Sequence, residues 1–281
     1  MQDVLKYLTW EITERGARII GCDEKFEGSM EIPSRLDGAA VVEIGRKAFS
    51  GRHSLKSVAI PDSVEVVGER AFAKCPELEE LQLGAGIKKI EYSAFYGCSS
   101  LKSVVIPDSV EVVGVGAFAE CSGLEELQLE AGIKKIETGA FAECVSLFTV
   151  EIPGTIESVG KEAFRGCSAL YIIFIPGTVV SVGEGAFEDC AGLEKLQLGE
   201  GIKKIEKGAF QGCDSLKSVV IPDSVEVVGE EAFAFCVVLE ELHLGAGIKK
   251  IEKGAFSWCQ SLKSVVIPGS VEVVGEGAFA F

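Results

Sequence analysis

The sequence predicts a solenoid, in which the chain winds through a series of similar turns around one extended hydrophobic core. Three observations support this prediction. The dipeptide Ala-Phe recurs at a constant interval of 23 residues, so that its Phe stands at eleven positions from Phe49 to Phe279. A leucine follows six residues after each of the first ten, from Leu55 to Leu262, and a cysteine follows three residues after nine of them. A fixed period of about 20–50 residues is typical of repeat architectures, because each turn can bury its apolar face only against its neighbours.

The leucines define the strand of each turn. In the unit L-x-x-(V/L/I)-x-(I/L), two alternating apolar residues face the core and the residues between them point outward. Leucines at this spacing, in a period of about 20–29 residues, are typical of leucine-rich repeats. The predicted fold is therefore a leucine-rich repeat solenoid, a right-handed curved superhelix. We expect a concave parallel sheet of about eleven short strands and an irregular or short-helical convex side.

The remaining positions of the unit form the core and the corners. We expect the recurring Phe and Cys residues to stack as two buried columns, in which each Phe stabilises the fold by about 1.5–3 kcal/mol. Proline has no amide hydrogen, so the prolines that follow the strands, such as Pro61 and Pro107, are expected to end them. Recurring glycines, such as Gly68 and Gly114, suit tight corners.

The full unit, L-x-x-(V/L)-x-I-P-x-x-V-x-x-(V/I)-G-x-x-A-F-x-x-C, resembles the BspA-like, or Treponema-type, leucine-rich repeat family over about residues 30–281. The opening segment, which contains YLTWEITERGARIIGC, is similar to the family's N-terminal β-hairpin, so the resemblance implies a capping hairpin over residues 1–29. The solenoid then covers residues 30–281 in eleven turns, of which the last is incomplete and uncapped. The resemblance also implies a ligand-binding or adhesive protein of the bacterial cell surface, whereas the N-terminus lacks a secretion pattern and no transmembrane segment is predicted.

Composition and charge argue against several classes of function. The net charge of -16 at pH 7 and the isoelectric point of about 4.7 disfavour nucleic acids and anionic membranes, which attract positive surfaces. No apolar run, including the one at about residues 171–175, is long enough for membrane insertion. The chain has two histidines, no phosphate-binding glycine motif and no serine–histidine arrangement. The sequence therefore predicts no catalytic residue and no cofactor.

The ten cysteines are interpreted as reduced thiols. Nine of them share one position of the repeat and should face the same way, which discourages disulfides between neighbouring turns. Reduced thiols mildly favour a reducing compartment. A zinc site would require CxxC-type spacing, which the sequence lacks, so no metal site is predicted.

Charges of opposite sign alternate along the outward positions of the turns. One column begins Lys56, Glu79, Lys102 and Glu125, and a second begins Glu65, Lys88, Glu111 and Lys134. Exposed ion pairs contribute only about 0–1 kcal/mol each. Their better use is to fix the register, since like charges opposite one another destabilise a sheet.

The alternation fails in the turns that begin at Leu147 and Leu170. Their outward positions carry Phe148, Tyr171, Ile172 and Phe174. An exposed apolar patch of this kind usually marks a binding surface, although apolar residues can also simply cover one another. We predict that a protein partner binds here, and we include Glu151 and His243 on the same concave face.

A second cluster lies two residues after the repeated Phe, where most turns carry polar or small residues. The last three turns carry Phe235, Trp258 and Phe281 there, and Val237 and Val238 are close in sequence. Solenoid ends need capping to remain soluble, so we expect this stripe to contact a cap, a partner or a second copy of the chain. The alternative is that these are ordinary exposed apolar residues on loops, which contact no partner.

The sequence therefore favours a non-enzymatic scaffold that binds a protein partner through its concave face. The second hypothesis is a structural module that forms homo-oligomers through its C-terminal end. The third is a carbohydrate or small-ligand binder that uses the concave aromatic residues. Nucleic acids and membrane insertion are not predicted.

Overall fold

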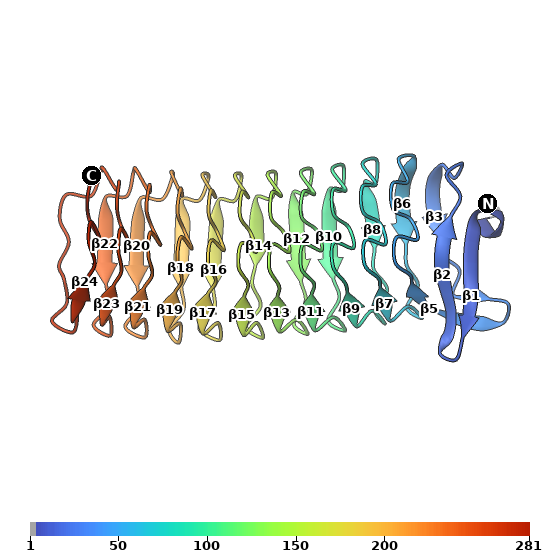
Figure 1. Cartoon of the computed structure of the whole chain (residues 1–281), viewed down its shortest axis with the longest axis horizontal. Coiled ribbons are helices and arrows are strands. Elements are labelled where there is room, and N and C mark those ends of the chain that lie inside the picture. Colours follow the sequence, from blue (N-terminus) through green and yellow to red (C-terminus); the bar gives the residue numbers. More distant parts are fainter. Residues whose placement is uncertain (1–3) are drawn as a thin grey trace.

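The computed structural model describes residues 4–281 as one row of stacked turns, which is nearly straight in the view of Figure 1. Successive turns lie side by side from the N-terminal hairpin to the C-terminal turn, and each contributes strands to two edges of the stack. The predicted leucine-rich repeat solenoid with parallel strands is confirmed. Over residues 4–281, the structure contains no helix that is long and apolar enough to cross a membrane.

The strands that follow the repeated leucines form the first edge of the stack. They alternate between exposed and buried residues, as in Ser103–Ile106, because every second side chain faces the core. An eight-stranded parallel sheet contains β3 (Gly28–Glu31), β6 (Leu55–Ala59), β8 (Glu80–Gln82), β10 (Ser103–Ile106), β12 (Glu126–Leu129), β14 (Thr149–Glu151), β16 (Ile172–Ile175) and β18 (Lys195–Leu198). A separate pair contains β20 (Ser218–Ile221) and β22 (Glu241–Leu244).

This edge agrees with the prediction of a parallel sheet of about eleven short strands. In residues 4–281, ten strands of this type form, the ladder is interrupted between β18 and β20, and residues 263–267 of the last turn form no strand. Val266, in this segment, is 85% exposed. The turns on either side of the interruption stay stacked because the second sheet and the Phe column continue across it.

The opposite edge of the stack is a second parallel ladder, where the sequence predicted irregular or short-helical structure. Its main path contains β1 (Leu8–Thr13), β2 (Gly16–Cys22), β5 (Ala39–Ile44), β7 (Val66–Val67), β9 (Lys89–Ile90), β11 (Val112–Val113), β13 (Lys135–Ile136), β15 (Ser158–Val159), β17 (Ser181–Val182), β19 (Lys204–Ile205), β21 (Val227–Val228), β23 (Lys250–Ile251) and β24 (Val273–Val274). Most of these strands have two residues, too few to leave an alternating pattern in the sequence. A glycine follows many of them because the turns approach closely: a Cβ atom on Gly68 would lie 2.8 Å from the carbonyl oxygen of Ile44.

The repeated Phe and Cys residues fill the core between the two ladders. The Phe rings from Phe49 to Phe279 stack with centroids 4.7–5.5 Å apart. Each column thiol, from Cys75 to Cys259, donates a hydrogen bond of 3.1–3.4 Å to the carbonyl oxygen of the Phe 26 residues earlier. A small side chain with a weak donor therefore satisfies a buried carbonyl in the preceding turn.

The chain begins with a short 3-10 helix, η1 (Val4–Tyr7), and the antiparallel hairpin of β1 and β2. Strand β2 pairs in parallel with β5, so the hairpin covers the first complete turn of the solenoid. The short strand β4 (Arg35–Leu36) pairs antiparallel with β5. Phe26 is buried at this end, where its ring meets that of Tyr7 edge to face.

Candidate binding surfaces

The aromatic residues predicted to form a partner site lie together on β14, β16 and the residues before them. The rings of Phe148 and Tyr171 stack in parallel with centroids 5.6 Å apart. Phe148 is 54% exposed, although its neighbour Leu147 is fully buried. The ammonium group of Lys195 lies 5.5 Å from the centre of the Tyr171 ring, where a cation is attracted by the ring face.

The register of the strands extends this cluster into a patch. Thr149 pairs with Ile172, and Glu151 pairs with Phe174, so the carboxylate of Glu151 borders the apolar residues. On the other side, Phe174 pairs with Gln197. Ile172 and Phe174 are 42% and 43% exposed. We call Phe148, Tyr171, Ile172 and Phe174 the strand-face patch: an apolar centre with polar neighbours, which is the arrangement of a binding interface.

His243 does not belong to this patch. It lies on β22 and pairs with Val220, and the strands β18 and β20 lie between β22 and the strand of Phe174. There it lines a cleft of about 510 Å³ between β22 and the last turn, together with Val265 and Val266. The prediction placed His243 on the same concave face because it occupies the outward position of the repeat that Phe174 occupies.

The predicted C-terminal stripe contains one stacked pair of rings. The rings of Phe235 and Trp258 are parallel, with centroids 6.1 Å apart, and the side chains are 44% and 46% exposed. Phe281 is 66% exposed at the end of the chain. Val237 and Val238 are only half-buried in the adjacent loop, and the carbonyl oxygen of Val237 accepts a hydrogen bond from the Ser261 amide.

The backbone at these aromatic positions is strained. Phe235 and Trp258 both have φ of 62°, in the left-handed region that bulky side chains avoid. The same repeat position holds Gly51, Gly97, Gly166 and Gly212 in other turns, with φ of 70–72°. The left-handed turn is thus a property of the repeat, and the aromatic side chains occupy it at an energetic cost.

The predicted charge alternation forms ion pairs between neighbouring turns. Five of these pairs lie in the two predicted columns: Lys102–Glu125 at 3.3 Å, Lys88–Glu65 at 3.1 Å, Lys134–Glu111 at 3.6 Å, Lys203–Glu226 at 3.7 Å and Lys249–Glu226 at 3.0 Å. These carboxylates and ammonium groups are exposed, so the pairs fix the register more than they stabilise the fold.

Cysteine chemistry is suppressed in the core. All ten cysteines are free thiols, and those of the column are buried. Burial raises the pKa of Cys144 and Cys167 well above the usual range, because a thiolate would lose its hydration there. In the part of the chain that the structure describes, no three His, Cys, Asp or Glu side chains gather in a way that could hold a metal ion.

The sequence analysis missed one further cluster, in the loops beside the repeated Phe of the first three repeats. Lys47, Arg70, Lys74, Tyr92 and Tyr96 line a cleft of about 520 Å³ there. The signal was present in the sequence. Arg70 occupies the position two residues before the repeated Phe, where six later turns have glycine, just as Trp258 replaces glycine two residues after it.

Comparisons with known proteins agree with the repeat architecture. The profile of the family described as "BspA type Leucine rich repeat region (6 copies)" matches residues 42–171 and 168–281. Among curated proteins, none matches this sequence.

Solved structures of bacterial leucine-rich repeat proteins are similar to this chain. The Treponema pallidum leucine-rich repeat protein TpLRR is 30% identical with a TM-score of 0.58, over 77% of this chain and 91% of that one. A leucine-rich repeat protein from Eubacterium ventriosum is 20% identical with a TM-score of 0.52, over 99% and 93% of the two chains. The pneumococcal vaccine antigen PcpA is 18% identical with a TM-score of 0.52, over 94% and 92%, and these last two show the fold alone. The 23-residue period, the stacked Phe and Cys columns and the profile match together establish that the chain belongs to the BspA-type leucine-rich repeat family.

Proposed function

We propose that this protein is a non-enzymatic scaffold that binds a protein partner at the strand-face patch. The stacked pair of Phe148 and Tyr171, with Ile172 and Phe174 on the adjoining strand, carries the proposal. Rigid strands hold these side chains in place before a partner arrives, so little conformational entropy is lost on binding. Aromatic anchors surrounded by polar residues are the usual centre of a protein interface.

The pattern of the repeat supports this assignment. At the position of Phe174, the neighbouring strands carry Glu151 and Gln197, and at the position of Tyr171 the following turn carries Glu194. In the turns on either side of this pair, Glu125 occupies the position of Phe148 and Glu194 that of Tyr171, so charged residues stand where this pair of turns has large aromatic ones. The repeat needs no apolar side chain at these outward positions, which favours a role outside folding.

The test uses peptides selected from a random library for binding to the wild-type protein. We expect the Phe174→Glu variant to bind these peptides at least about thirtyfold more weakly, the loss typical of an interface anchor. The matched control is Val220→Glu, which introduces the same charge at the same repeat position on β20, where Val220 is 62% exposed.

Two results would count against the proposal. If both variants lose binding equally, the effect is one of general charge and the patch has no special role. If the library yields no peptide that depends on Phe174 while a neutral glycan binds in a Phe174-dependent manner, the patch is a carbohydrate site instead. Circular dichroism of both variants establishes that each remains folded.

We also propose self-association through the C-terminal stripe as a second function. The strained, stacked and exposed rings of Phe235 and Trp258 support it, since such strain persists in sites with a role. Light scattering over a concentration series is expected to give a dimer that Trp258→Glu converts to a monomer. The control is Val115→Glu, a similar change on a loop of a central turn, where Val115 is 39% exposed. A wild-type monomer at all concentrations would contradict this second proposal.

A further inference from the structure

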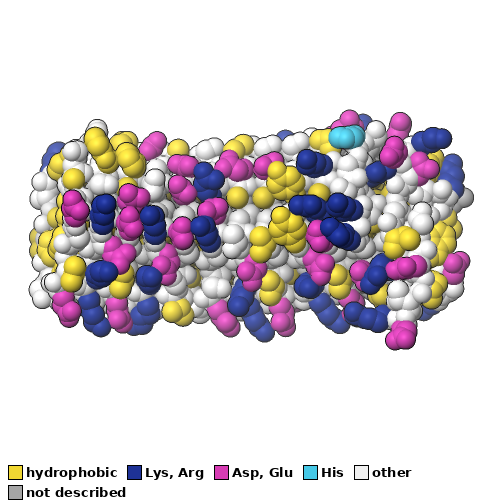
Figure 2. Space-filling view, in the orientation of Figure 1, with side chains coloured by type: hydrophobic (Ala, Val, Ile, Leu, Met, Phe, Trp, Pro, Cys, Tyr) yellow, Lys and Arg dark blue, Asp and Glu magenta, His cyan; other side chains and the backbone are white. Residues whose placement is uncertain are grey.

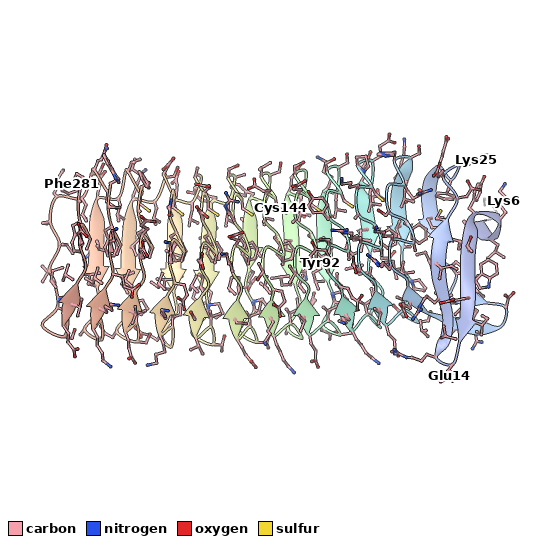
Figure 3. The ribbon with its side chains drawn as sticks, in the orientation of Figure 1. Lys6, Glu14, Lys25, Tyr92, Cys144 and Phe281 are labelled. Carbon is pink, nitrogen blue, oxygen red and sulfur yellow. The ribbon has the colours of Figure 1, made fainter. Side chains whose placement is uncertain are left out.

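A cleft on the loop side of the first three repeats gathers positive charge on an acidic protein. The cleft has a volume of about 520 Å³, and its walls include Lys47, Arg70, Lys74, Tyr92 and Tyr96. Figure 2 shows this side of the molecule: acidic and basic side chains alternate along its C-terminal half, whereas a dark-blue group lies beside large hydrophobic side chains nearer the N-terminal end. Tyr92 is labelled in Figure 3.

The three cations of the cleft have no carboxylate partner. In residues 4–281, no ion pair within 4.0 Å involves Lys47, Arg70 or Lys74. The nearby acids are engaged elsewhere: Glu69 pairs with Arg46 at 3.4 Å, and Glu91 pairs with Lys89 at 2.8 Å. On a chain with a net charge of -16, three adjacent uncompensated cations form a local site that attracts anions.

The loss of alternation at this place has a clear origin in the repeat. The position three residues before the repeated Phe carries charges that pair between turns, as in Lys161–Glu184 at 3.0 Å and Lys207–Glu230 at 3.4 Å. In the third repeat this position is Tyr92, so the column carries no charge there and the alternation stops after Arg46 and Glu69. The Arg70 guanidinium instead lies over the Tyr92 ring, with its central carbon 5.3 Å from the ring centre.

The two tyrosines add ring surfaces to this charge. Tyr92 is 45% exposed, and its ring stays accessible beside Arg70. A hydrogen bond with Glu120 raises the pKa of the Tyr96 hydroxyl, so Glu120 holds the polar end of that ring at the margin of the cleft. Aromatic faces of this kind pack against the apolar faces of bound rings, while neighbouring cations bind acidic substituents.

Four residues of the cleft adopt left-handed backbone conformations without being glycine. Their φ angles are 57° at Lys47, 53° at Arg70, 59° at Lys74 and 52° at Ser93. The repeat accepts glycine at both positions concerned, as Gly97 and Gly116 illustrate. Other turns place glutamates such as Glu143 and Glu162 at these positions, so the cleft is distinguished by the long basic side chains that gather there.

The backbone amides of the cleft residues are not available to bind a ligand. The amides of Lys47, Arg70 and Lys74 donate hydrogen bonds to the carbonyl oxygens of Glu69, Tyr92 and Tyr96 in the next turn. An extended peptide could therefore not pair with this edge as an added strand. Recognition must come from side chains, namely cations and tyrosine faces, and this combination suits a charged sugar better than a peptide.

We propose that this cleft binds an acidic saccharide, in which sulfate or carboxylate groups contact Lys47, Arg70 and Lys74 while a sugar ring packs against Tyr92 or Tyr96. The site lies on the loop side of repeats one to three, whereas the strand-face patch lies on β14 and β16, so the two proposals are independent.

The test measures the dissociation constants of three hexasaccharides by calorimetry at low salt. A heparin-derived hexasaccharide carries sulfates, unsulfated chondroitin carries carboxylates alone, and cellohexaose is neutral. We expect the two acidic probes to bind and the neutral probe not to bind. The Lys47→Gln/Arg70→Gln variant should bind the acidic probes about tenfold more weakly, because two exposed charge contacts are lost.

Matched variants distinguish binding at the cleft from a general effect of the protein's net charge. Lys217→Gln/Lys263→Gln removes the same charge far from the cleft, and we expect less than about a twofold change. Tyr92→Ser keeps every charge but removes a ring, and it should weaken binding several-fold. Three results would each overturn the proposal. These are an equal loss of binding in both double variants, unchanged binding by Tyr92→Ser, and no binding of either acidic probe. Tighter binding of a sulfotyrosine peptide than of both acidic saccharides would also overturn it, in favour of a peptide site.

Discussion

Glycine should stabilise this protein more than alanine at position 235, which reverses the usual order for an ordered residue. Phe235 has φ of 62°, and glycine adopts this conformation without the steric cost of a Cβ atom. Replacement by either residue removes the ring that stacks on Trp258 at 6.1 Å. The lost stacking energy is thus common to both variants, and the difference between them reports the backbone alone.

The size of this difference follows from two opposing effects. A non-glycine residue in the left-handed region costs about 1–2 kcal/mol. Glycine has more freedom in the unfolded chain, which costs about 0.4–1 kcal/mol relative to alanine. We therefore expect Phe235→Gly to exceed Phe235→Ala in free energy of unfolding by roughly 0.5–1 kcal/mol. Relative to wild type, Phe235→Ala should lose about 0.5–1.5 kcal/mol of ring stacking.

Urea denaturation followed by circular dichroism measures these free energies, and Gly97→Ala provides the reverse experiment. Gly97 occupies the same repeat position with φ of 70°, and an added Cβ atom would meet its nearest neighbour, Lys74, at 3.7 Å, an ordinary contact. Gly97→Ala should thus lose roughly 0.5–1 kcal/mol from the same backbone cost, with no steric clash. If alanine proves equal or superior to glycine at both positions, the left-handed conformation carries no strain and the argument from strain to function fails.

Three further predictions concern the core, the thiols and the charge columns. Phe141→Ala should cost about 3–5 kcal/mol in urea denaturation, because both faces of its ring are stacked, whereas Phe279→Ala, with one stacked face, should cost less. Alkylation followed by mass spectrometry should label Cys22 slowly at pH 8 and faster as the pH rises, because burial raises the pKa of this thiol to about 11; a constant rate between pH 8 and 10 would contradict this. Lys249 lowers the pKa of Glu226, so the stability from this carboxylate is present above its unfolded pKa and is lost as the pH falls through the lower folded pKa. An NMR titration should therefore show a higher Glu226 pKa in Lys249→Met; an unchanged value would exclude this pair as the cause.

The core of this fold could be predicted from the sequence because its constraints recur in every turn. Phe72 and Phe256 meet the same neighbours, since a Phe 23 residues away on each side provides the next ring. A residue that recurs with the period of the sequence therefore predicts a contact that recurs in every turn. The strand-face patch was predicted for the complementary reason: Phe148 and Tyr171 break an outward pattern of charges, and such breaks are visible without coordinates.

The features that the sequence did not reveal depend on local geometry. The two-residue strands of the second ladder, such as Val66–Val67, are shorter than any pattern that alternation can detect. The separation of β18 from β20 occurs between turns with the usual leucine and valine positions, and nothing in the structure explains why it falls there.

The cleft of Lys47, Arg70 and Lys74 was missed because the sequence of a single turn does not predict which residues have a left-handed backbone. An alignment of the turns reveals such positions. Lys74 and Gly97 occupy the same position of the repeat and both have positive φ, so glycine would fit in either turn. A repeat protein thus provides its own comparison. Each residue that replaces glycine at such a position can be compared with another turn that has glycine at the same position. Aspartate at Asp189 tolerates the left-handed region well, so it needs no special role. Arginine, lysine, glutamate and aromatic residues do not. The basic ones lie at the cleft and the aromatic ones at the C-terminal stripe, whereas Glu143 and Glu162 adopt the same conformation in other turns. The glycine variants proposed above therefore measure what such a position costs the fold, in comparison with a turn that kept glycine.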